Sequence, residues 1–338
     1  MRTPRSEAYA TLSANVRGIV AMLAAVATFA VMDLSMKRLV ETYPAIQVTF
    51  LRGVTSLPLL LAATGLLGRW GDLVPRRWTL HLVRGLLSVF VLWAFVYAVK
   101  LLSLGDAYAI FMSAPLVITA LSVPMLGERV GWRRWLAVCV GLIGVLVILK
   151  PSGNNWISLG GLAALAASIG YAINALTIRI LSRSDTADAT IVWPLVILAA
   201  ASGFIALPAW VPLRLEHAAW IATLGITGAL AQHLMTYAFR RATPAVLAPL
   251  EYTALAWAML FDYVVWATTP SLRMLAGAAI IVASGLYVFQ RERRVAARHS
   301  ATVGLQDPNA GKDFSQRRRV AEVRRTESNG EDNRTLGS

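Results

Sequence analysis

The chain has 338 residues, of which 57% are hydrophobic and 15% are charged. Soluble domains carry about 25% charged residues, so a mean hydropathy of +0.59 places this chain in the membrane class. The net charge of +14 would suit nucleic acid. The basic residues are instead spread between apolar segments, as at the ends of membrane spans, which argues against a nucleic-acid partner.

Cysteine and histidine usage gives no sign of a metal or cofactor. Cys139 is the single cysteine, so no disulfide can form within the chain. The histidines are scattered, and none pairs with the cysteine at a metal-ligand spacing. The sequence therefore predicts no metal site and no cofactor.

Apolar segments follow a basic N-terminal tail, residues 1–17. No small-residue cleavage site follows the first segment, so we interpret it as an uncleaved span rather than a signal peptide. A helix needs about 20 apolar residues to cross about 30 Å of hydrocarbon. This requirement predicts ten spans, at residues 18–37, 45–67, 79–100, 105–126, 134–150, 157–180, 190–210, 218–239, 244–266 and 271–290.

Ten spans would place both termini on one side of the membrane. Alternate connections hold ten basic residues in one set and six in the other, and the richer set shares its side with both termini. The positive-inside rule then predicts cytoplasmic termini in a bacterial inner membrane. Residues 291–338 are polar and basic, which predicts a disordered cytoplasmic tail. Contact of this tail with a partner or with anionic lipid is the less favoured alternative.

The two halves of the chain match at a constant shift of 140 residues. Tyr97-Ala98 matches Tyr237-Ala238, and Gly85 matches Gly225. Each half, 18–150 and 157–290, holds five predicted spans, an odd number, so the second copy must enter the membrane inverted. The predicted fold is an all-α membrane protein of ten transmembrane helices in two inverted five-helix repeats. Such repeats are typical of alternating-access transporters, whose site lies at the repeat interface.

A charged side chain inside a span is costly and therefore indicates function. Glu251 lies in the ninth predicted span, two residues after Pro249, which removes a backbone hydrogen bond and favours a kink. A carboxyl group beside a kink, with Tyr252 next to it, is expected to line a cavity. There it could bind a cationic or amide group, or carry a coupling proton.

Other charged residues in the spans leave alternatives open. Asp33 and Arg52 are predicted either to contact substrate or to form a structural ion pair inside the bundle. For Lys37, Arg84 and Asp106 we favour side chains that extend to the membrane interface.

Aromatic and amide side chains recur at helical spacing. The pairs one turn apart, and two polar neighbours in the eighth span, would suit a flat or ring-bearing solute. Helix packing and interface anchoring remain the plainer interpretation of any single aromatic. The candidates are Trp93 with Tyr97, Tyr171 with Asn174, and Gln232 with His233.

Several local motifs resemble those of one family. They are Phe50-Leu51-Arg52, Gly105-Asp106-Ala107-Tyr108, Leu126-Gly127-Glu128 and Ala248-Pro249-Leu250-Glu251-Tyr252. With the duplicated ten-span plan, residues 16–290 resemble the EamA branch of the drug/metabolite transporter superfamily. Where the family usually has a second Gly-Glu pair, this chain has Ala267-Thr268, which puts the cap of that half in doubt.

The resemblance implies a secondary carrier for small organic metabolites, coupled to protons or exchanging solutes, as a monomer or homodimer. Asp33 and the Glu251-Tyr252-Thr253 run look most like bacterial members assigned to riboflavin or S-adenosylmethionine uptake. Riboflavin uptake is the leading expectation, with S-adenosylmethionine uptake or amino-acid export as alternatives. A membrane-embedded enzyme is the alternative class, but no nucleophile–base pair or phosphate loop is visible, so no catalytic residue is predicted.

Overall fold

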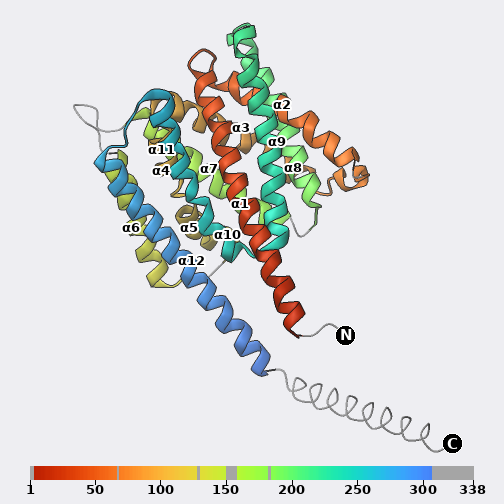
Figure 1. Cartoon of the computed structure of the whole chain (residues 1–338), viewed down its shortest axis with the longest axis vertical. Coiled ribbons are helices and arrows are strands. Elements are labelled where there is room, and N and C mark those ends of the chain that lie inside the picture. Colours follow the sequence, from red (N-terminus) through yellow and green to blue (C-terminus); the bar gives the residue numbers. More distant parts are fainter. Residues whose placement is uncertain (1–3, 67, 128–129, 150–157, 182–183, 307–338) are drawn as a thin grey trace, which may run out of the picture. The chain divides into compact units, whose positions relative to one another are not determined.

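The computed structural model describes residues 4–66, 68–127, 130–149, 158–181 and 184–306. Within these ranges the chain forms helices joined by short connections, with no strand (Figure 1). Contacts divide the chain into two units, 1–288 and 289–338. The helices of the first half are α1 (Pro4–Val40), α2 (Ala45–Leu66), η1 (Trp70–Leu73), α3 (Trp78–Leu101), α4 (Leu104–Phe111), α5 (Ala114–Leu126) and α6 (Trp132–Leu149).

The second half also has six α-helices, with two 3-10 helices after its second α-helix instead of one. Its helices are α7 (Leu159–Leu181), α8 (Ala187–Ala206), η2 (Leu207–Ala209), η3 (Leu215–His217), α9 (Ala218–Arg241), α10 (Pro244–Glu251), α11 (Thr253–Trp266) and α12 (Leu272–Gln306).

Eight helical stretches of the described residues are long and apolar enough to cross a membrane. They coincide with the first seven and the tenth of the predicted spans. The predicted eighth span is helical as α9, and the ninth is divided into α10 and α11, but neither is among those eight. The chain is therefore a multi-pass helical membrane protein, and the count of ten spans stays a prediction.

The helix bounds of the two halves keep the register that the residue matches predicted. The first and last residues of α3 and α9 differ by 140 at both ends, as do those of α4 and α10. The helices α5 and α11 end 140 residues apart, and α6 and α12 begin 140 residues apart. Each α-helix of one half thus has an α-helical counterpart in the other, while the short 3-10 helices do not correspond.

One helix of each half is broken at the same place. The break between α4 and α5 falls at Met112-Ser113, and the break between α10 and α11 falls at Tyr252. Pro115 lies in the first turn of α5 and Pro249 lies inside α10. Proline has no N–H to donate to the preceding turn, which weakens the helix there. Pro249 lies within α10, before the break at Tyr252, so the kink expected near this proline stays a prediction.

The two broken helices also end in the same backbone conformation. Gly127 caps α5 with φ 68°, and Ala267 caps α11 with φ 51°. The Ala267 N–H donates to the carbonyls of Asp262 and Tyr263, as a C-terminal cap requires. Alanine therefore closes the second half in the left-handed conformation that glycine adopts in the first. Glu128, the other residue of the Gly-Glu pair, lies outside the described residues.

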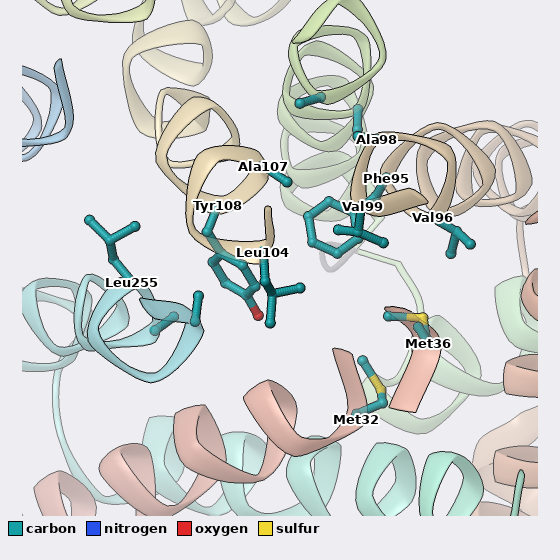
Figure 2. Packing of buried hydrophobic residues seen from close by; sticks show 14 of the residues in the cluster. Met32, Met36, Phe95, Val96, Ala98, Val99, Leu104, Ala107, Tyr108 and Leu255 are labelled. Carbon is teal, nitrogen blue, oxygen red and sulfur yellow. The ribbon is translucent and has the colours of Figure 1, made fainter. Parts of the chain in front are cut away.

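Helices of the two halves pack in alternation. In the order α1, α9, α2, α8, α3, α7, α4 and α11, each helix packs against the next, and α11 packs back against α1. Buried residues from α1, α3, α4 and α11 point into one central region, where Figure 2 shows Met32, Phe95, Tyr108 and Leu255. Any site in this region is therefore built from both halves.

The C-terminal segment differs from its prediction. Helix α12 continues to Gln306, so residues 291–306 are helical where disorder was expected. This stretch holds alanine, arginine, glutamate and glutamine, which are strong helix formers, and it has no proline. Residues 307–338, the rest of the predicted tail, lie outside the described residues.

Candidate functional site

Glu251 is the last residue of α10, at the break that precedes α11. Its side chain is partly buried, and it has no hydrogen bond or ion pair with any side chain that the structure describes. It interacts electrostatically with Tyr171 of α7 and with Tyr252. A partly buried carboxyl group without a protein partner is available to a solute or a proton.

A row of aromatic rings begins beside Glu251. The ring of Tyr171 lies 5.3 Å from that of Phe111 at the end of α4. Phe111 lies 5.3 Å from Phe95 of α3, and Phe95 lies 5.7 Å from Tyr108. These edge-on and tilted contacts are favourable geometries for aromatic rings. The row therefore joins α7, α4 and α3, running from Tyr171, which is 37% exposed, to the buried Tyr108.

A second carboxyl group stands at the other end of this row. The Tyr108 hydroxyl donates a hydrogen bond to Asp33 Oδ2 of α1, and both side chains are buried. Arg52 of α2 interacts electrostatically with Asp33, while its buried Nε has no hydrogen-bond partner. Both sequence-based alternatives, a structural ion pair and a substrate contact, stay predictions, because Arg52 attracts Asp33 while Tyr108 also bonds it. Tyr108 holds Asp33, and Arg52 keeps a donor unused.

The arrangement offers a solute three features: two carboxyl groups, a row of aromatic rings and an unused arginine donor. Two carboxyl groups on opposite halves can attract a cation or exchange a proton, and the aromatic row can stack a ring. An unsatisfied buried donor such as Arg52 Nε costs free energy unless a partner reaches it. These three features together define the candidate site: Asp33, Arg52, Tyr108, Phe111, Tyr171 and Glu251.

Asn174 lies on α7, one helical turn after Tyr171, but its side chain bonds to residues of α3 and not to the candidate site. Its Oδ1 accepts from Arg84 Nε at 2.7 Å, and its Nδ2 donates to Ser88 Oγ at 2.8 Å. Arg84 also donates to the Thr190 carbonyl of α8. The expectation that Arg84 extends to the membrane interface is therefore wrong, because these bonds satisfy its charge within the bundle.

Lys37 also differs from its prediction. Its Nζ lies 2.6 Å from Oδ1 of Asp262, which is buried on α11. The same carboxylate accepts the backbone N–H groups of Leu104 and Gly105 at 2.9 and 2.6 Å. It thereby caps α4, where the helix dipole favours negative charge.

Asp106 takes part in a local cap at the start of α4, and its place at the membrane interface stays a prediction. Its backbone N–H donates to Ser103 Oγ at 2.9 Å, and the Ser103 hydroxyl lies 2.7 Å from Asp106 Oδ2. A serine followed three residues later by an acidic residue is a common N-terminal helix cap.

Three of the predicted aromatic contacts lie away from the row. Trp93 and Tyr97 stack at 5.8 Å, and Trp93 shares the exposed face of α3 with Leu86 and Phe90. Tyr97 is partly buried against the central cluster, so the pair runs from the core to the exposed face. Tyr252 points toward α12, where its hydroxyl lies 1.9 Å from the position that a Cβ on Gly285 would take.

Gln232 and His233 line a separate pocket between α2, α8 and α9. Glu251 and Asp33 do not line it. The site residues that the sequence predicted are therefore divided among the central region, the helix packing and this pocket.

Sequence reasoning missed Tyr108 and Phe111 as site residues. Tyr108 stood in a quoted motif, but its partner Asp33 lies 75 residues away. No local pattern reports such a contact, which depends on how α1 and α4 pack.

Outside the spans, a polar cluster joins the turn before α8 to the start of α3. Asp185 accepts from the Arg76 backbone N–H at 2.7 Å, contacts His81 Nε2 at 3.1 Å and accepts from Ser184 Oγ at 2.6 Å. Burial alone would raise the pKa of Asp185, but these hydrogen bonds outweigh it and lower the pKa to about 2.

The fold and the interior polar groups define a class of protein: a multi-pass helical transporter built from two similar halves. Residues 16–150 and 158–290 each match the EamA-like transporter family. The chain belongs to that family, which lies in the drug/metabolite transporter superfamily.

Curated relatives agree with this assignment. A Helicobacter pylori protein named an uncharacterized transporter is 32% identical over 58% of this chain and 68% of its own length. A Vibrio cholerae riboflavin transporter is 28% identical over 75% and 86%, respectively. A Rickettsia bellii S-adenosylmethionine uptake transporter is 26% identical over 79% and 91%. These names indicate transport rather than catalysis.

One solved crystal structure shares the fold. It superposes with a TM-score of 0.57 at 21% identity, covering 84% of this chain and 98% of the solved one. At this identity the likeness concerns the fold alone.

Proposed function

We propose that this transporter carries a small ring-bearing organic solute into the cell across the bacterial inner membrane, with riboflavin as the first candidate. The observation that carries the proposal is the unpartnered Glu251 carboxyl group at the end of the interior aromatic row. Ten spans in two inverted repeats, with both termini in the cytoplasm, complete the proposed arrangement.

The position of the site suits alternating access. Asp33 and Tyr108 come from the first half, and Glu251 and Tyr171 from the second. Movement of one half against the other would open a site between these residues first to one side of the membrane and then to the other. Inverted-repeat carriers work by this alternating access. The transport is secondary, since the sequence has no phosphate-binding loop.

The aromatic row favours a flat solute. Phe95, Phe111 and Tyr171 offer ring faces and edges within 5.3 Å of one another along the row. The relatives named for riboflavin transport make a flavin ring the first compound to test.

S-adenosylmethionine is the second candidate, and a separate observation favours it. Asp33 and Glu251 place two carboxyl groups in the interior, and a carboxylate attracts a cation more strongly there than in water. A sulfonium-bearing solute with an adenine ring would use both these groups and the aromatic row. Relatives named for its uptake match up to 86% of this chain.

The test is uptake of labelled riboflavin and labelled S-adenosylmethionine by cells that lack their own carriers. We expect wild type to accumulate one compound. Glu251→Gln is expected to reduce that uptake about tenfold or more, because a bond to a charged group contributes about 1.5–3 kcal/mol. Glu216→Gln is the matched control, because Glu216 is exposed and pairs with Arg214 at the surface.

Each result decides between the readings. Accumulation of riboflavin favours the flavin carrier, and accumulation of S-adenosylmethionine favours the second candidate. Export of an amino acid by wild-type cells would reverse the proposed direction. Wild-type rates in Glu251→Gln at every pH would contradict the role of this carboxyl group, and a change in total compound rather than its location would favour an enzyme.

A further inference from the structure

A pocket of about 140 Å³ lies between α2, α8 and α9, apart from the candidate site. Its polar wall comes from helix ends that lie together: Arg69 follows α2, Asp188 is in the first turn of α8, and Arg240 is in the last turn of α9. Gln232, His233 and Thr236 extend this wall along α9.

The pocket holds more unused donors than acceptors. Arg69 is occupied, because its Nε lies 2.9 Å from Asp72 and its Nη2 lies 3.1 Å from Asp188. Within the described part of the chain, the Arg240 guanidinium and the side chains of Gln232 and His233 have no hydrogen-bond or ion-pair partner. One free guanidinium with an amide and an imidazole beside it favours an anion, and phosphate oxygens match a guanidinium well.

The pocket also has an apolar wall. Leu60, Ala63, Ile191 and Val192 line it. His233 lies on the outer face of α9 with Ile226 and Leu230, which are 56% and 49% exposed. In a membrane protein, exposed leucine and isoleucine face hydrocarbon. A ligand here would place its anion at Arg240 and an acyl chain along the apolar wall.

We propose that this pocket binds the phosphate headgroup of an anionic phospholipid, with Arg240 as the principal contact and Gln232 and His233 as further donors. A free phosphate ion would use Arg240 but would leave the apolar wall in contact with lipid or water. The pocket thus gives Gln232 and His233 a role outside the solute site.

The experiment uses the purified full chain in detergent, titrated with phosphatidylglycerol or phosphatidylcholine and read by native mass spectrometry. We expect phosphatidylglycerol to bind more tightly than phosphatidylcholine. Arg240→Gln is expected to reduce this preference about fivefold, the contribution typical of one basic residue near anionic lipid. Arg214→Gln is the control, because this exposed arginine pairs with Glu216 outside the pocket.

Gln232→Leu provides a second variant should Arg240→Gln fold poorly, and it is also expected to weaken the preference. Equal binding of the two lipids to wild type would overturn the proposal. An unchanged preference in both folded variants would also overturn it. Inorganic phosphate that displaces phosphatidylglycerol at equal concentration would assign the pocket to a free anion instead.

Discussion

The broken helices α4–α5 and α10–α11 have the same backbone and different chemistry. Their bounds, their breaks and their left-handed caps correspond at a shift of 140 residues. At that shift the unpartnered Glu251 corresponds to Phe111, and the buried Asp262 corresponds to Ser122. The backbone register is thus shared, while the carboxyl groups differ: Glu251 and Asp262 have no acidic counterpart in the first copy.

The connections between helices show a similar contrast. Before α8, Asp185 contacts His81 of α3 and the Arg76 backbone. Before α2, Tyr43 takes the equivalent part, because its hydroxyl lies 2.9 Å from His217 Nδ1 and accepts the Arg214 N–H at 3.0 Å. A carboxylate makes the hydrogen bonds of one connection, and a phenol hydroxyl makes those of the other.

A repeated backbone therefore does not imply a repeated functional site. Packing positions of the two halves correspond, because both must form the same helices. A functional group needs to occur only once if, as proposed, a single solute site lies between the halves. The following substitutions test where this asymmetry matters, beginning with the largest expected effect.

Asp262→Ser gives α11 the residue that α5 has at the corresponding position, Ser122. We expect a loss of about 3–5 kcal/mol in the free energy of unfolding, because it leaves the buried Lys37 ammonium unpaired. Thermal unfolding in detergent measures this loss. Adding Lys37→Met should recover part of it, while Ser122→Ala should have little effect. Equal losses in the single and double variants would show that the ion pair is not the cause.

Tyr108→Phe removes the hydroxyl that holds Asp33. We expect a loss of about 1–3 kcal/mol in stability, because the buried carboxyl group loses its donor. Tyr97→Phe is a matched control, since Tyr97 lies on α3 and stacks on Trp93 without a hydroxyl hydrogen bond among the described residues. Equal stability of the two variants, compared by denaturant or thermal unfolding, would contradict the role of the Tyr108–Asp33 bond.

The Asp185 cluster makes a pH-dependent contribution. The pKa of Asp185 falls from 3.8 to about 2 on folding, so its stabilisation is complete above pH 3.8 and is lost as the pH falls toward 2. Asp185→Asn should therefore be less stable than wild type at pH 6 and nearly equal to it at pH 2. Melting temperatures across this range measure the effect. Tyr43→Phe alters the matched connection without removing a carboxyl group, so its deficit should be similar at both pH values.

Ala267→Gly makes the two caps alike. We expect a gain of about 1 kcal/mol, because alanine with φ 51° is strained and glycine is not. Gly127→Ala should lose a similar amount, because Gly127 has φ 68°. The two melting temperatures should move in opposite directions. A loss of stability in Ala267→Gly would show that the cap is not strained.

Much of the fold could be predicted from the apolar segments and their breaks. The 140-residue register and eight spans follow from patterns that are local or repeated along the chain. The site could be predicted in part. Glu251, Asp33 and Arg52 were found because charge inside a span is costly wherever it occurs.

The remaining assignments needed the tertiary structure. Lys37 and Arg84 have the composition of interface residues, yet partners on distant helices hold them inside the bundle. Trp93 and Gln232 have the aromatic and amide side chains expected of a solute site, but Trp93 lies on an exposed face and Gln232 lines a separate pocket.

The sequence by itself determined which segments are helical and apolar, that they are duplicated, and which of them carry a buried charge. These properties depend on hydration and backbone bonding along one segment. Only the tertiary structure decided that Tyr108 meets Asp33, that the aromatic row runs to Glu251, and that Gln232 and His233 form a separate pocket. Such contacts depend on helix rotation and on which neighbours pack together, and side chains from segments far apart in the chain determine both.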